Sequence, residues 1–151
     1  MHSRRQALKK TAIVAGLLAS TGMFPQFAFA FNKDAFEAKS VQDTLKALGA
    51  GALTESKDVT ITGPDIAENG AVVPLAVSTT LPGVKRLLVL VEKNPASLIA
   101  LFNVSDSVEP AFSIRAKMGQ SSDVYAVAIM ADGKALFAKK EVKVTLGGCG
   151  G

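Results

Sequence analysis

Short runs of apolar and β-branched residues, separated by turn residues, fill the chain from residue 57 onward. Runs of this length, with no helical segment between them, are typical of an all-β domain. We expect strands at residues 59–62, 71–80, 84–91, 98–104, 111–118, 122–131 and 134–146. About seven strands at this spacing predict an immunoglobulin-like antiparallel β-sandwich over residues 52–146. The chain lacks the core tryptophan and the cysteine pair of antibody domains, so the pattern predicts only the architecture.

Three of the expected strands carry further signals. The run 84–91 (VKRLLVLV) is apolar almost throughout, which favours a central strand. Pro74 cannot donate a backbone hydrogen bond, so it predicts an edge position or a bulge near the start of 71–80. Asp132 and Gly133 stand between two strand patterns and predict a hairpin with a two-residue turn.

The segment before the strands has a different period. Between residues 31 and 48, apolar residues recur at helical spacing: Ala38, Val41, Leu45 and Leu48. Asn32 or Asp34 can cap the start of a helix, and glycines follow its end. We therefore expect one amphipathic helix within residues 31–51. Its apolar stripe is explained most simply by packing onto the domain rather than onto a partner.

Residues 1–30 have the features of an export signal. Four basic residues and no acidic one precede an apolar stretch that is short and interrupted by glycine. The segment 28–30 (AFA) is a typical cleavage site, so we expect cleavage after Ala30. Arg4 and Arg5 indicate the twin-arginine route, although the usual motif has an aromatic residue where Ala7 stands. The alternative is an uncleaved membrane anchor.

The export signal changes how the charge of the chain is interpreted. The whole chain has 17 Lys and Arg against 13 Asp and Glu, a formal charge of +4. Residues 1–30 contain four of the basic residues and none of the acidic ones, so the remainder carries equal numbers of each. Nucleic-acid binding depends on a basic surface, so we expect no nucleic-acid partner. We also expect no stable membrane insertion after cleavage.

Cleavage also removes His2, the only histidine. Without histidine, the mature chain cannot form a Ser-His-Asp or Cys-His catalytic group or a histidine metal site. One cysteine is too little for zinc, an iron–sulfur cluster or c-type haem. Nucleotide-binding glycine motifs are absent and the acidic residues are scattered. We therefore expect a protein that is not an enzyme and has no catalytic residue, metal or cofactor.

The most distinctive segment is the C-terminal arm, residues 147–151, which directly follows the last expected strand. In it the only cysteine, Cys149, stands among four glycines: Gly147, Gly148, Gly150 and Gly151. Glycine has no side chain, so such an arm is thin and conformationally free. The three residues from Leu146 to Cys149 extend at most about 10 Å. The thiol can thus be presented beyond the domain, to a narrow pocket of another protein.

A lone cysteine is ordinarily a small buried hydrophobe, but a glycine arm offers no core in which to bury it. An incidental cysteine at a disordered end, or a cloning scar, is the other simple interpretation. No base adjoins the thiol in sequence, which makes Cys149 a poor catalyst on its own. An arm is suited instead to carrying a covalently bound group between enzymes that supply the chemistry.

These features together resemble the SoxY family, the sulfur-carrier subunits of the periplasmic Sox system for thiosulfate oxidation. The resemblance rests on the twin-arginine signal, the strand pattern with Asn94-Pro95 and Asp132-Gly133, the run 142–145 (VKVT) and, above all, the terminal GGCGG. It implies that Cys149 is the covalent attachment site for thiosulfate-derived sulfur intermediates. It also implies a non-enzymatic carrier located in the periplasm.

The resemblance implies a set of partners as well. Family members form a heterodimer with the small β-sandwich subunit SoxZ. The resulting SoxYZ complex visits the haem-containing SoxAX, the hydrolase SoxB and, where present, the sulfane dehydrogenase SoxCD. The implied cycle is oxidative conjugation of thiosulfate to Cys149, hydrolytic release of sulfate, removal of the remaining sulfane sulfur, and a further hydrolysis that regenerates the thiol.

Two other functions fit part of the pattern. The terminal Gly150-Gly151 is similar to the end of ubiquitin-like sulfur carriers, whose carboxylate becomes a thiocarboxylate. Export away from ATP, and a domain richer in strands than a β-grasp fold, oppose that assignment. Alternatively, Cys149 forms intermolecular disulfides and the protein is an exported assembly module.

Overall fold

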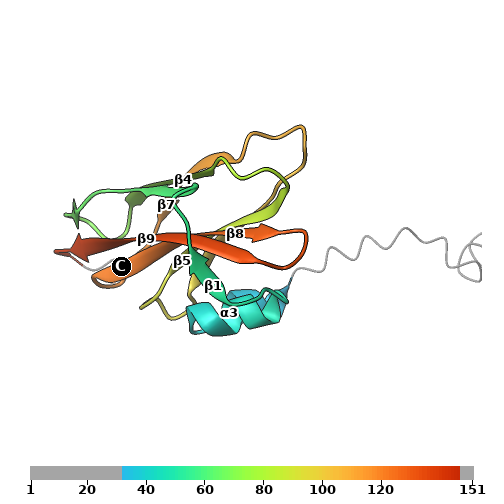
Figure 1. Ribbon diagram of the computed structural model, residues 1–151. Coiled ribbons are helices and arrows are strands. Elements are labelled where there is room, and N and C mark those ends of the chain that lie inside the picture. The colour runs from blue at the N-terminus through green and yellow to red at the C-terminus, as the bar shows by residue number, and fades with distance from the viewer. Residues whose placement is uncertain (1–31, 147–151) are drawn as a thin grey trace, which may run out of the picture. The chain divides into compact units, whose positions relative to one another are not determined.

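The computed structural model of the protein describes residues 32–146. Two β-sheets pack face to face, and two short helices cover the outer face of the larger one (Figure 1). The elements are α2 (Lys33–Glu37), α3 (Val41–Ala47), β1 (Leu53–Glu55), β2 (Val59–Thr62), β3 (Ile66–Ala67), β4 (Val73–Thr79), β5 (Val84–Val91), β6 (Leu98–Asn103), β7 (Ala111–Ala116), β8 (Ser122–Met130) and β9 (Ala135–Val144). The large sheet has the order β1-β9-β8-β5-β6, with β3 also paired to β9, and the small sheet has the order β2-β4-β7. The predicted β-sandwich is confirmed.

All seven expected strands are present, with ends that differ by no more than a few residues. The strands β1 and β3 were not predicted, because three and two residues are too few to show an alternating pattern. Both pair with β9 in the parallel direction, so the large sheet is mixed rather than wholly antiparallel. Together they give β9 a neighbour on the side opposite β8.

The apolar run in β5 is explained by burial on both faces of the large sheet. Leu87, Val89 and Val91 face the small sheet and belong to the core of the sandwich. Leu88 and Leu90 point to the other face, where they pack with residues of the two helices. Successive side chains of a strand point to opposite faces, so the part of β5 that lies between the two apolar layers has no position for a polar residue. The prediction of a central strand is confirmed.

The prediction of a single N-terminal helix is wrong, because two short helices occupy this segment. Asn32 caps α2 by accepting a hydrogen bond from the backbone N–H of Ala35, as expected. The backbone is extended at Ala38, with ψ of 134°. Ser40 then caps α3, and its hydroxyl accepts from the N–H of Asp43. A serine that satisfies a free N–H at a new helix start competes with continuation of the first helix.

The apolar stripe of this segment packs onto the domain as expected. Val41, Leu45 and Leu48 of the expected stripe are buried in one cluster with residues of β5, β6 and β8, and Ala35 joins them. Ala38, the fourth residue of the expected stripe, is the C-cap of α2 and is only partly buried. The end of α3 is tied to the large sheet, because the Arg86 guanidinium donates to the carbonyl of Leu48 at 3.0 Å. Gly49 follows with a positive φ of 69°, the conformation that glycine adopts most readily after a helix.

The hairpin between β8 and β9 is present, but its loop is longer than predicted. Three residues, 131–133, rather than two lie between Met130 and Lys134, which are the last residues joined by a hydrogen bond across the hairpin. The N–H of Gly133 donates to the carbonyl of Met130, and the N–H of Met130 donates to the carbonyl of Lys134. Gly133 has a positive φ of 86°. This is a tight turn followed by a glycine bulge, which is the next most common way to close a hairpin.

Pro74 lies in β4, the central strand of the small sheet, rather than at the predicted edge or bulge. The pairing explains why it is tolerated. The strand β2 ends at Thr62, opposite Ala76, so Pro74 has a strand neighbour only on β7. Its carbonyl oxygen faces Gly63, on the unpaired side. The N and O of one residue point to the same side of a strand, so the missing N–H leaves the ladder with β7 intact.

Among residues 32–146, no helix is long and apolar enough to cross a membrane.

Candidate functional site

The residues predicted to carry the function lie outside the described part of the chain. These are the sulfur-binding Cys149, the arm glycines Gly147, Gly148, Gly150 and Gly151, and the export residues Arg4 and Arg5. The structure describes instead the root of the arm, which we define as Lys143–Leu146 together with the segments that hydrogen-bond to it. The site is therefore built from this end of the sandwich.

The end of β9 is held from both sides. On one side, the N–H groups of Lys143 and Thr145 donate to the carbonyls of Asp65 and Ala67, at 2.9 and 3.1 Å. On the other side, the N–H of Val144 donates to the hydroxyl of Ser121 at 2.8 Å. These contacts continue the ladder beyond the last pair of β8 and β9, Ser122 with Val142. The strand therefore remains paired almost to the point at which the arm begins.

The last described residue is linked to the small sheet as well. The carbonyl of Leu146 accepts from the N–H of Gly70, at 2.8 Å. The carbonyl of Gly70 in turn accepts from the N–H of Met118, which follows β7, at 2.7 Å. Asn94 lies in the turn between β5 and β6, and its side-chain amide donates to the carbonyl of Lys117, which follows β7. This hydrogen bond joins the two segments. The arm thus starts from a point fixed to both sheets.

One ion pair stabilises the same region. The ammonium of Lys140 donates to the carboxylate of Asp65, the residue that also accepts the backbone bond from Lys143. This hydrogen bond and the charge of Lys140 lower the pKa of Asp65 below its ordinary value. The Asp65 side chain is 88% exposed, so the pair contributes little free energy, but it connects the segment before β3 to β9.

Exposed apolar side chains gather at the root of the arm. Within residues 32–146, four large hydrophobic residues are classed as exposed: Ile66, Val72, Val108 and Leu146. Ile66 lies opposite Lys143 in the β3–β9 pair, and Val72 lies two residues after Gly70, the hydrogen-bond partner of Leu146. We call Ile66, Val72 and Leu146 the apolar rim. These three residues are 59%, 52% and 66% exposed.

Val108 lies at the other end of the sandwich. It belongs to the loop between the end of β6 and the start of β7. The strand register places Asn103 opposite Arg86, near the start of β5, whereas β9 ends beside the start of β8. In Figure 1 this loop and the tip of β9 lie at opposite ends of the molecule. Exposed apolar surface is therefore concentrated where the arm leaves.

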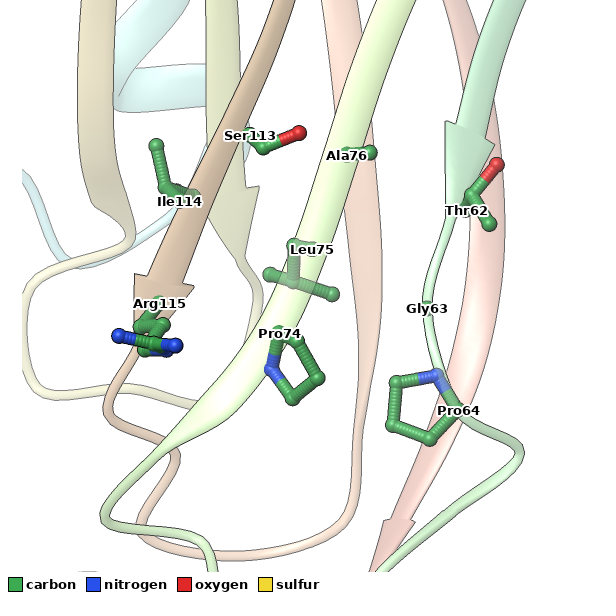
Figure 2. Close-up of a pocket in the computed structure, with 9 residues that line it drawn as sticks. All are labelled: Thr62, Gly63, Pro64, Pro74, Leu75, Ala76, Ser113, Ile114 and Arg115. Atoms are coloured by element: carbon green, nitrogen blue, oxygen red, sulfur yellow. The ribbon is translucent and has the colours of Figure 1, made fainter.

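A groove of about 730 Å³ opens on the outer face of the small sheet near the same end. Figure 2 shows Pro74 between the Arg115 side chain and Pro64, with Thr62 and Ser113 further along the strands. The floor is built from small side chains, and Arg115 is its only charged group. Gly63 packs closely against the sandwich core, since a Cβ there would come within 2.8 Å of the Leu75 side chain.

Among residues 32–146 there is no group of three or more His, Cys, Asp or Glu side chains placed to hold a metal ion. The rim and the groove were not predicted from sequence.

Comparison with known proteins decides the family. The model of the family described as sulfur oxidation protein SoxY matches residues 45–149, most of the chain and through to Cys149. The chain belongs to the SoxY family. Among solved structures, the sulfur carrier protein SoxY from Chlorobium limicola f thiosulfatophilum is 34% identical, with a TM-score of 0.61. The match covers 70% of this chain and 96% of that chain.

The SoxY fold is also similar to proteins of a different description. A variant of the superoxide reductase (neelaredoxin) from Ignicoccus hospitalis has a TM-score of 0.54 at 14% identity, covering 61% of this chain and 94% of that one. A putative superoxide reductase from Thermotoga maritima has a TM-score of 0.51 at 11% identity, covering 61% and 93%. Identities this low show the fold alone. A sequence search of curated proteins finds no significant match.

Proposed function

We propose that the protein is a covalent sulfur carrier of thiosulfate oxidation, which holds its sulfur intermediates on the thiol of Cys149. The observation that carries the proposal is the SoxY family match, which extends through Cys149. The root of the arm supports it. The backbone stays hydrogen-bonded beyond β9 as far as Leu146, three residues before the cysteine, so the position from which the arm starts is fixed.

The chemistry requires only a sulfur nucleophile from this chain. The Cys149 thiol loses its proton and forms a bond to the outer sulfur of thiosulfate, and the pair of electrons released passes to a haem enzyme of the SoxAX type. Water then attacks the sulfonate in a SoxB-type hydrolase, the bond between sulfonate and sulfane sulfur breaks, and sulfate and a proton leave. A persulfide remains on Cys149. A SoxCD-type enzyme oxidises the outer sulfur to a sulfonate, with oxygen taken from water and the electrons passed to that enzyme, and a second hydrolysis releases sulfate and regenerates the thiol. Alternatively, the outer sulfur is transferred to another acceptor, which regenerates the thiol directly.

The same proposal includes a location and a permanent partner. Arg4 and Arg5 direct the chain to the twin-arginine route, and cleavage after Ala30 releases it in the periplasm. There it pairs with a SoxZ-type β-sandwich subunit as a SoxYZ complex. The assignment as a non-enzyme follows from the carrier role, in which the partner enzymes supply the acid–base chemistry and this chain supplies the thiol.

The test is a Cys149→Ser variant in thiosulfate oxidation reconstituted with the partner enzymes. We expect the variant to fold and to bind its SoxZ-type subunit, because residue 149 follows the last strand. We expect thiosulfate-dependent electron transfer to fall to background, since a serine hydroxyl cannot form the sulfur–sulfur bond. Turnover retained in the variant would contradict the proposal. A loss of subunit binding would indicate an assembly module instead.

A further inference from the structure

The apolar rim lies at the point where the C-terminal arm leaves the domain. Ile66 and Val72 belong to the segment between β2 and β4 that wraps the end of β9, and Leu146 is the residue from which the arm departs. Figure 1 shows this segment, in green, beside the tip of β9. All three residues are more than half exposed, whereas the apolar residues of β9 itself are buried or partly buried.

The length of the arm limits how far an enzyme can stay from this surface. Cys149 is three residues beyond Leu146, so it lies within about 10 Å of Leu146 in any conformation. An enzyme that places catalytic groups around the Cys149 sulfur must therefore bring its own surface to within that distance of Leu146. The length of the chain therefore brings the enzyme close to the root of the arm, where the rim lies, provided that Cys149 is the reacting group.

We propose that the apolar rim is the docking surface for the enzymes that act on Cys149. This inference rests on the proposed carrier function. The fitting partner has a narrow active-site channel, no more than about 10 Å deep, whose entrance is lined by apolar side chains. Burial of the rim then contributes binding free energy at the same moment at which the thiol enters the channel.

The partner that binds the apolar rim is an enzyme in a short-lived complex, rather than a permanent subunit or a second copy of the chain. A permanent partner on the rim would cover the point from which the arm extends and block access to the thiol. Three side chains also bury little area, which suits short-lived encounters better than a stable dimer. Successive enzymes can then use one surface in turn, because each needs the same short reach to Cys149.

The test compares polar substitutions on and off the rim. The variants are Ile66→Gln, Val72→Gln and the pair together, with Val108→Gln as the matched control at the opposite end. Leu146 is left unchanged, since it adjoins the arm. Each full-length carrier, bound to its SoxZ-type subunit, is treated with tetrathionate. The thiolate displaces thiosulfate and acquires a sulfur-linked sulfonate, so loading requires no enzyme. Release of sulfate by the SoxB-type hydrolase is then measured against carrier concentration.

We expect kcat/KM to fall at least about tenfold in the paired variant, as for the loss of central apolar anchors of an interface, and to stay within about twofold in Val108→Gln. Tetrathionate loading and thermal unfolding should be the same in every variant. Equal kcat/KM in rim and control variants would overturn the docking surface while leaving the carrier function intact. Failure of the unmodified protein to release sulfate from Cys149 would overturn the proposed function itself.

Discussion

Thr44 and Ser97 show how single polar residues position the helical layer. Both are fully buried, and their hydroxyls are 2.8 Å apart. The Thr44 hydroxyl also lies 2.9 Å from the carbonyl of Ser40, and the N–H of Ser97 donates to the carbonyl of Ala38. In the described part of the chain every buried side-chain nitrogen and oxygen has a hydrogen-bond partner. The two hydroxyls therefore hold α3 against the start of β6.

Thr44→Val should destabilise the protein by about 1–3 kcal/mol, because it leaves the buried Ser97 hydroxyl without its best partner. Replacing both residues, as Thr44→Val with Ser97→Ala, should cost less than the two single changes added together, since no unpaired hydroxyl remains. Chemical denaturation of the single and double variants measures this. Strictly additive losses would show that the two hydroxyls do not interact.

At the residue scale, the sequence predicts correctly those contacts that a side chain makes with residues close to it along the chain. Asn32 was expected to cap a helix because an Asx side chain reaches the N–H three residues on, and it does. The rim residues could not be recognised, since the exposure of Ile66 and Val72 depends on how the segment between β2 and β4 folds around β9. Cys149 was singled out by its place among the terminal glycines after the last strand, and its role is a proposal.

At the scale of elements, the open side of the sandwich is closed by an aromatic pair. The rings of Phe102 in β6 and Phe112 in β7 are stacked, with centroids 4.1 Å apart and planes 5° from parallel. These strands are the edges of different sheets, so no backbone ladder joins them. The stacked rings link the large and small sheets at a position where hydrogen bonds cannot.

A double-mutant cycle with Phe102→Leu and Phe112→Leu should give a coupling free energy of about 0.5–1.5 kcal/mol, as expected for a stacked pair beyond the area that each ring buries. Equilibrium unfolding in urea supplies the four stabilities. Leucine retains most of the apolar volume, which separates the loss of stacking from the creation of a cavity. Absence of coupling would mean that the sheets are joined by their general core alone.

The ion pair of Asp65 and Lys140 predicts a small dependence of stability on pH. Lys140 lowers the pKa of Asp65 in the folded state, so the pair stabilises the protein above the unfolded-state pKa. That contribution is lost as the pH falls through the lowered value. Asp65→Asn should therefore unfold at a slightly lower temperature than the unmodified protein at neutral pH, and at the same temperature in strong acid. A difference that persists in acid would rule out the ion pair as its cause.

The strands were predictable because alternation of apolar and polar side chains is a local property. The division of the helical segment was not, since it depends on Ser40 capping a second helix and on the contact of Ser97 with Ala38, 59 residues away. The parallel strands β1 and β3 are formed by the backbone of β9, which leaves no pattern in their own few residues. The turn after β8 depended on a glycine bulge that the Asp-Gly pair alone does not distinguish from a tighter turn.

At the scale of the whole molecule, the described residues form a β-sandwich whose last strand, β9, leads into the short C-terminal arm at one end. The helical layer and the small sheet both cover the large sheet, which contains β9. The end of β9 is bonded to β3, to the segment before β8 and to the segment before β4. Exposed apolar residues surround this end, and a groove with one guanidinium lies nearby. The molecule thus presents a contact surface and a tether together.

The measurement that tests the carrier account most directly is the mass of the C-terminal peptide after incubation with thiosulfate and the partner enzymes. The account predicts a peptide heavier by a thiosulfate-derived group, with fragmentation placing the added sulfur on Cys149 and release of the group by a reducing thiol. An unmodified Cys149 with sulfur on the carboxylate of Gly151 would contradict it, as would a disulfide between two chains as the only product.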